Sequence, residues 1–253
     1  MQMKKILAFI LIAVCLLLVV GCETNVNVDP NKKSEGTMTY AEYIAAEVGS
    51  QVVIEAFVQG KQDYRQDLGK GTVYLQDGNG GYLAYRIKCT EAEYKKIEIG
   101  SKIKVTGTKD VWKGLVELKE DCTFEIVGND TWVAEATDIT SLLGTDELIN
   151  KQNMKVSFKG MKIEEKVDNN GNKCAFFYNW DNSGESDPYA DLYFDVSVNG
   201  KTYTCVIESS LCNSDSDVYK AVQALKVGDI VDMEGFLYWY EGPQPHITNI
   251  TVK

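Results

Sequence analysis

The stretch VYLQDGNGGYLAYRI, residues 73–87, decides the fold because it reads as two strands joined by a tight turn. The turn, DGNGG at residues 77–81, consists of residues that tolerate positive φ angles, and the runs beside it alternate apolar and polar side chains. We therefore predict a β-hairpin. Alternation gives it a core face with Val73, Leu75, Leu83, Tyr85 and Ile87, and an outer face with Tyr74, Gln76, Tyr82 and Arg86.

Further elements are predicted on both sides of this hairpin. Alternating apolar runs indicate strands at residues 52–58, 102–108 and 114–118. Thr90 and Glu93 have capping-box spacing and predict a short helix over residues 90–97, and Thr39 and Glu42 predict another near the start of the ordered chain. Residues 39–128 would then form one domain of five strands, with a helix between the third and the fourth.

The second half of the chain repeats this order. A strand is expected at residues 155–160 and a capped helix over residues 215–225. Gly100 and Gly107 flank a strand after the first helix, and Gly228 and Gly235 flank one after the second helix at the same spacing. The repetition predicts a duplicated domain over residues 129–253.

Five strands with a helix between the third and fourth resemble the OB-fold, a small Greek-key barrel. The turn at residues 75–82 resembles that fold's strand two to strand three connection, and the segments around Gly107 and Gly235 resemble the strand after its helix. The expected fold is therefore mainly β, with two tandem OB-fold-like five-stranded Greek-key barrels. The resemblance implies a ligand on the strand two and three surface, although members of the fold bind nucleic acids, sugars or proteins.

The first residues predict export and lipidation. Lys4 and Lys5 precede an unbroken apolar run over residues 6–20, which is short for a transmembrane helix, and Gly21 and Cys22 close it. This pattern resembles a lipobox, so residues 1–21 are predicted to be a signal peptide and Cys22 the lipidated residue. Residues 22–38 are polar and predict a flexible tether. The whole chain resembles OB-fold lipoproteins of gut bacteria that are described as nucleic-acid-binding, which implies an anchor in the cell membrane or outer membrane.

Composition limits the chemistry. The formal net charge of −11 becomes −13 when Lys4 and Lys5 leave with the signal peptide, so bulk attraction to polyanions is excluded. His246 is the only histidine, no Cys-x-x-Cys occurs, and nucleophile, phosphate-loop and zinc-protease motifs are absent. We predict no enzyme activity, no metal site and no cofactor. The oxygen-rich loops at residues 168–171 and 181–188 lack EF-hand spacing and are interpreted as solvated turns.

Two groups of residues are candidate ligand contacts. The first consists of Tyr74, Tyr82 and Arg86 on the outer face of the hairpin, with Trp112 in a nearby turn. The second group is aromatic and lies in the second domain: Trp180, Tyr193, Trp239, Tyr240 and His246. The alternative for both groups is ordinary packing, as cross-strand pairs in the first and as core or interface side chains in the second.

The leading hypothesis is a non-enzymatic, lipid-anchored envelope protein that binds an extended ligand, either single-stranded nucleic acid or an oligosaccharide. The alternative is a structural or assembly module whose aromatic surface holds another envelope protein. A third class, an OB-fold attached to a nuclease or hydrolase, has no catalytic cluster in the sequence to support it.

Overall fold

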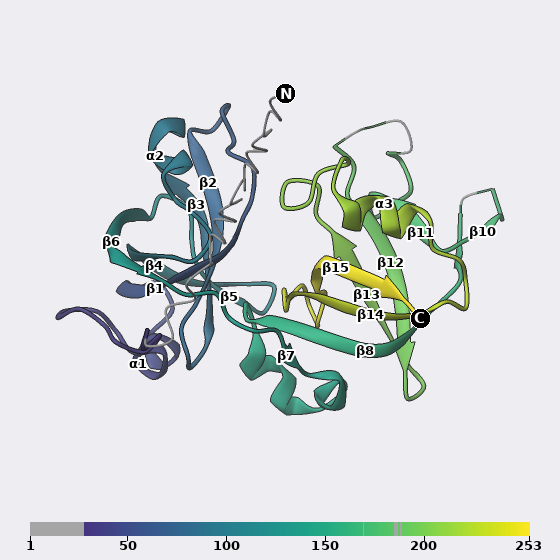
Figure 1. Cartoon of the computed structure of the whole chain (residues 1–253), viewed down its shortest axis with the longest axis horizontal. Helices are drawn as coiled ribbons and strands as arrows, with labels where there is room; N and C mark the ends of the chain where they lie inside the picture. Colours follow the sequence, from purple (N-terminus) through teal and green to yellow (C-terminus); the bar gives the residue numbers. More distant parts are fainter. Residues whose placement is uncertain (1–27, 169, 185–186, 188) are drawn as a thin grey trace, which may run out of the picture.

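The structure is a computed structural model that describes residues 28–253 except 169, 185, 186 and 188. Two β-barrels lie side by side, with the N-terminal half in one and the C-terminal half in the other (Figure 1). Within the described residues, no helix combines the length and the apolar character that crossing a membrane requires. The predicted signal peptide and Cys22 lie outside the described residues.

The first barrel is a six-stranded sheet in the order β1-β2-β3-β5-β4-β6, closed by a second pairing between β1 and β4. β3 and β5 are parallel, and β5 and β6 pair in succession along β4 as one interrupted fifth strand. Its elements are α1 (Tyr40–Ala45), β1 (Gln51–Lys61), β2 (Lys70–Gln76), β3 (Gly81–Lys88), α2 (Glu91–Lys95), β4 (Ser101–Trp112), β5 (Leu115–Leu118) and β6 (Thr123–Thr131).

The second barrel repeats this topology. β8 pairs with both β12 and β14, and β13 runs parallel to β15. Its barrel elements are β8 (Lys155–Ile163), β12 (Leu192–Val198), β13 (Lys201–Ile207), α3 (Asp217–Gln223), β14 (Ile230–Phe236) and β15 (His246–Val252). Short elements occupy the connections: β7 (Thr137–Asp138), η1 (Thr140–Leu142), η2 (Asp146–Lys151), β9 (Lys166–Val167), β10 (Lys173–Cys174) and β11 (Phe176–Tyr178). The prediction of two tandem OB-fold barrels, each with a helix between its third and fourth strands, is confirmed.

Local sequence signals explain why the barrels form. Both predicted capping boxes are present, since the side chains of Glu42 and Glu93 accept hydrogen bonds from the backbone N–H groups of their N-cap threonines. The glycines within the fourth strands permit close contact: a Cβ at Gly107 would lie 2.6 Å from Cys122, and one at Gly235 would lie 2.1 Å from the carbonyl oxygen of His246. Only glycine fits at such crowded points of a coiled sheet.

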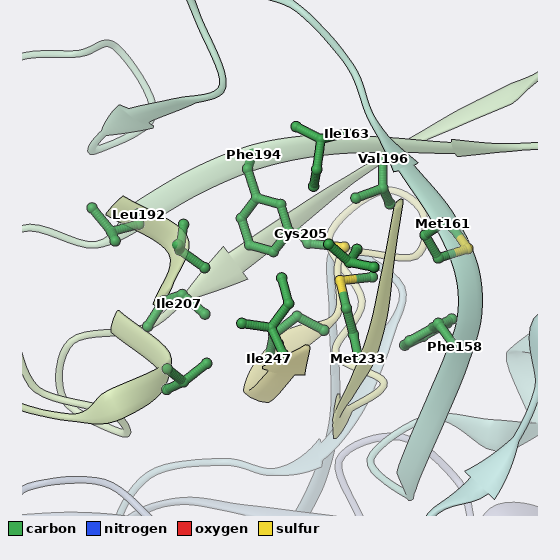
Figure 2. Close-up of a cluster of buried hydrophobic side chains, with 14 of the residues drawn as sticks. Phe158, Met161, Ile163, Leu192, Phe194, Val196, Cys205, Ile207, Met233 and Ile247 are labelled. Atoms are coloured by element: carbon green, nitrogen blue, oxygen red, sulfur yellow. The ribbon is translucent and has the colours of Figure 1, made fainter. Parts of the chain in front are cut away.

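Each barrel has its own apolar core. Figure 2 shows the core of the second barrel, where Phe158, Phe194, Met233 and Ile247 point toward one another from four strands. Val218 and Val222 of α3, and Leu225 just beyond its end, are buried against this core. A separate core fills the first barrel, so the sequence repeat corresponds to two packed units.

The predicted faces of the first hairpin need correction. Leu75 pairs with Tyr82, and Tyr74 pairs with Leu83. Because directly opposed residues of an antiparallel pair point to the same side, Tyr82 belongs to the core and Leu83 to the outer face. Between the turn and a bulge in the pairing at Gly71 and Val73, the alternation of β3 is therefore offset by one residue from the prediction. Beyond this bulge, Ile87 points into the core as predicted.

The predicted flexible tether is wrong for its described part. The Lys33 ammonium contacts Asp77 Oδ2 and the carbonyl oxygen of Glu55, each at 2.6 Å, and the Met38 N–H donates to the carbonyl of Val53. Buried partners thus hold this polar segment against the first barrel. The predicted domain boundary at Gly128 also falls within β6, which stays in the first sheet to Thr131.

Candidate functional site

The outer face of the β2–β3 hairpin is covered by the second barrel. Tyr74 and Leu83 lie there beside Leu115, and Phe236 from β14 packs on them. The rings of Tyr74 and Phe236 are stacked, with centroids 4.3 Å apart and planes 9° from parallel. All four side chains are buried. The surface on which an OB-fold ordinarily carries its ligand is therefore an interface between the barrels here.

A polar cluster continues this interface. His246 Nδ1 lies 2.9 Å from both the Tyr74 hydroxyl and Glu208 Oε2, and Gln62 Nε2 donates to the same Glu208 oxygen at 2.7 Å. Burial raises the pKa of Tyr74 well above its usual value, and the negative charge of Glu208 raises it further. Burial alone would raise the pKa of Glu208, but the charge and hydrogen bond of His246 bring it below its usual value.

Two turns, one from each barrel, also meet at the junction. Trp112 ends β4 and lies 5.2 Å, centroid to centroid, from Tyr240 in the β14–β15 connection. Next to them, the Lys113 ammonium pairs with Glu241 Oε1 at 2.5 Å, and the Glu241 N–H donates to the carbonyl of Lys113. The first barrel therefore contributes an aromatic side chain to the surface of the second.

A pocket of about 520 Å³ opens on the outer face of β12 and β13 beside these turns. Tyr193 pairs with Val206 across the two strands, while Leu192 and Phe194 point into the core. The lining, called the junction pocket below, consists of five aromatic side chains together with an imidazole, two carboxylates, an amide and a valine: Trp112, Trp180, Tyr193, Tyr238, Tyr240, His246, Asp191, Glu208, Gln244 and Val206. It is bounded by the β8–β12 and β14–β15 connections of the second barrel. These correspond to the loops after the first and the fourth barrel strand, which flank the ligand site of an OB-fold.

The chemistry of the junction pocket is that of recognition. Burial raises the pKa of Tyr193 to about 12, so its phenol stays neutral. Burial also raises the pKa of Asp191 despite hydrogen bonds from Ser209. In the described part of the chain, no group of three or more His, Cys, Asp and Glu side chains is arranged to hold a metal ion. The arrangement can stack planar groups and exchange hydrogen bonds with them.

Several predicted residues come together in this pocket. Trp112, from the first candidate group, lies beside Trp180, Tyr193, Tyr240 and His246 from the second. Trp180 is the most open of them, with 76% of its surface exposed. Residues predicted as two separate surfaces thus line one site at the barrel junction.

The other predicted contacts lie elsewhere. Tyr74 and Tyr82 are both fully buried, Tyr74 under Phe236 and Tyr82 in the first core, where its hydroxyl donates to Asp77 at 2.7 Å. Their prediction as exposed ligand contacts is therefore wrong. Arg86 lies in a different hollow, within 3.5 Å of Glu120. Trp239 packs between the barrels, against Gly114.

Sequence reasoning missed Asp191, Glu208, Tyr238 and Gln244. Asp191 immediately precedes β12 and Glu208 immediately follows β13, so each stands at the end of a buried strand. Tyr193 was already a candidate. Alternation along residues 192–198 would have placed it on the outer face and indicated the strand ends beside it as further candidates. No sequence signal indicated that Trp112 joins this lining, because the packing of the two barrels brings it into the pocket.

Comparison of the sequence with protein-family models and with curated proteins finds no match. Comparison of the structure with solved structures finds similar folds. One is described as the Ifi202 HINa domain in complex with 20bp dsDNA, with 12% identity over 81% of this chain and 98% of that chain and a TM-score of 0.33. Another is a murine DNA binding protein bound with ds DNA, with 11% identity, coverage of 79% and 97%, and a TM-score of 0.33.

A third is a Replication Protein A heterotrimer bound to ssDNA, with 11% identity over 80% of this chain and 49% of that chain and a TM-score of 0.32. At such identities and TM-scores, the similarities do not extend to the ligand. The OB-fold assignment of this chain stands on its own strand order and pairing.

Proposed function

We propose that this chain binds an extended ligand, single-stranded nucleic acid or an oligosaccharide, in the junction pocket. The observation that carries the proposal is the position of five aromatic side chains on the open β12–β13 face, at the place where OB-folds receive ligands. Both ligand classes offer ring faces that pack on aromatic side chains: the planar bases of nucleic acid and the C–H faces of sugar rings. A volume of about 520 Å³ suits one or two such rings.

The proposed site lies on the second barrel because the two barrels use the same face differently. The first barrel gives its β2–β3 face to the interface with Phe236, whereas the second keeps its β12–β13 face open. Trp112 reaches this open face from the first barrel. The tandem arrangement thus makes one composite site from two barrels.

We further propose that the protein is a non-enzymatic binding protein of the cell envelope, held by a lipid on Cys22. The charged start, the apolar run and the Gly21-Cys22 junction support the anchor. Three exposed aromatic side chains, Trp112, Trp180 and Tyr240, line a hollow instead of a flat patch, which favours ligand binding over the assembly of another envelope protein.

The test is a binding screen of residues 22–253 carrying Cys22→Ser, followed by intrinsic tryptophan fluorescence. Two of the four tryptophans, Trp112 and Trp180, line the pocket, so an occupant should change the emission. Tyr240→Ala should weaken binding roughly 5- to 100-fold, because it removes one aromatic contact. Tyr189→Ala is the matched control, since Tyr189 is 82% exposed and lies outside the pocket lining. Equal affinities for both variants would refute the assignment of the pocket.

A further inference from the structure

The charged groups of the junction pocket are two carboxylates and the imidazole of His246, whose charge faces Glu208. Asp191 and Glu208 line it, His246 lies against Glu208, and Gln244 is neutral. Within the described residues, neither lysine nor arginine belongs to the lining. The nearby Lys113 ammonium is already paired with Glu241. Among the described residues no cation forms an ion pair with Asp191, so a ligand that enters this pocket meets negative charge there.

Such a lining disfavours binding of a phosphodiester backbone. Proteins that bind nucleic acid place Lys and Arg against the phosphates, and release of counterions supplies much of the affinity. Here a phosphate would approach the Asp191 carboxylate in a partly desolvated hollow, where charges are screened less than in bulk water. The net charge of −11 adds repulsion at longer range.

Asp191 offers a specific acceptor. Its Oδ1 receives hydrogen bonds from the Ser209 N–H and hydroxyl, at 2.7 and 2.9 Å, whereas its Oδ2 receives none from the described residues. Burial has removed part of its water, so the carboxylate gains from any donor that reaches Oδ2. A sugar hydroxyl is a neutral donor of suitable size, and the C–H face of a sugar ring packs well on indole and phenol rings.

From these contacts we propose that the junction pocket takes an oligosaccharide that carries no phosphate, sulfate or carboxylate group. Trp112 and Trp180 supply the faces for sugar rings, and Asp191 accepts hydrogen bonds from sugar hydroxyl groups. This inference rests on the proposed function, because it names the ligand class of the same pocket. It adds the requirement that the ligand carries no negatively charged group.

The experiment compares ligand classes on one array that carries neutral oligosaccharides, oligouronates and a dT12 oligonucleotide. Residues 22–253 with Cys22→Ser should bind at least one neutral oligosaccharide and neither of the anionic probes. Affinity for the neutral ligand should stay constant between about 50 and 500 mM salt, because no counterion is released. Trp112→Ala and Trp180→Ala should each weaken it roughly 5- to 100-fold, with Trp112→Phe intermediate.

Asp191→Asn distinguishes neutral from anionic ligands most sharply, because it should change their affinities in opposite directions. Binding of the neutral oligosaccharide should weaken roughly tenfold, because the variant removes a charged hydrogen-bond acceptor. Binding of an anionic ligand should strengthen, because the variant removes a negative charge. Tyr189→Ala should leave every affinity unchanged, and thermal melting of each variant checks its folding.

The outcomes separate the two proposals. Binding of dT12 that depends on Trp112 and Trp180 and improves in Asp191→Asn would overturn the oligosaccharide inference but keep the pocket. Binding that ignores both tryptophans, or no binding by any probe, would overturn the proposed function as well.

Discussion

Glu117 should make the first barrel less stable as the pH rises, and Glu117→Gln should remove that effect. The residue lies on β5 opposite Asp110 and is only 7% exposed. Burial, followed by the charge of Asp110, raises its pKa from 4.5 to about 7, despite the opposing charge of Arg86. The folded state therefore binds the proton more tightly than the unfolded chain does.

The raised pKa of Glu117 sets the direction of the pH effect on stability. The stabilisation that its bound proton contributes is fully present below pH 4.5 and is lost as the pH rises through about 7. Each pKa unit corresponds to about 1.4 kcal/mol, so ionisation should cost the folded state about 3 kcal/mol. Glutamine resembles the protonated acid. Glu117→Gln should therefore raise the free energy of unfolding by about 3 kcal/mol at pH 8 and by little at pH 4.5.

Urea unfolding of residues 22–253 with Cys22→Ser, at pH 4.5, 6, 7 and 8, measures this difference. Comparing variant with parent at each pH cancels other titrating groups such as Glu208. Glu135→Gln is the control, because Glu135 is exposed and should show a difference that does not change with pH. A gain from Glu117→Gln that is the same at pH 4.5 and pH 8, or a loss at pH 8, would refute the reasoning.

Two other perturbations test the junction and the anchor. Phe236→Ala should lower the free energy of unfolding by about 3–5 kcal/mol, because it empties a buried site beneath Tyr74; calorimetry would show a lower melting temperature, and an unchanged melt would contradict the junction. Cys22→Ser in the whole chain should abolish incorporation of labelled fatty acid, and labelling equal to the parent would exclude Cys22 as the acylation site.

The fold was predictable because its signals are local. The turn at residues 77–81, the capping boxes at Thr39 and Thr90, and the paired spacing of Gly107 and Gly235 each specify a short element on their own. Their order then restricts the topology, since a helix between the third and fourth of five strands fits few folds. Capping, turn and packing signals agree in both halves, which is why the duplication could be predicted.

The site was harder to predict because burial at an interface leaves no local signal. Tyr74 is an outward residue of its hairpin, as alternation predicts, but Phe236 covers it from a distant strand. Tyr82 was misplaced for a different reason: the register pairs it with Leu75, and a one-residue offset moves a side chain to the other face. Outward aromatic residues can be found from sequence, whereas their solvent exposure depends on how the barrels pack.

The polar residues at the junction link barrel packing to the ligand pocket. Glu208 and His246 line the pocket, while Tyr74 and Gln62 reach the same cluster from the first barrel. The lowered pKa of Glu208 shows that the folded state favours its charged form, so this stabilisation is present above the usual glutamate pKa and is lost as the pH falls through the lower, folded value. Above that range, the Glu208 carboxylate is held in place by groups from both barrels. The contacts that fix the second barrel on the first therefore also fix the positions of Glu208 and His246 in the pocket lining that a ligand meets.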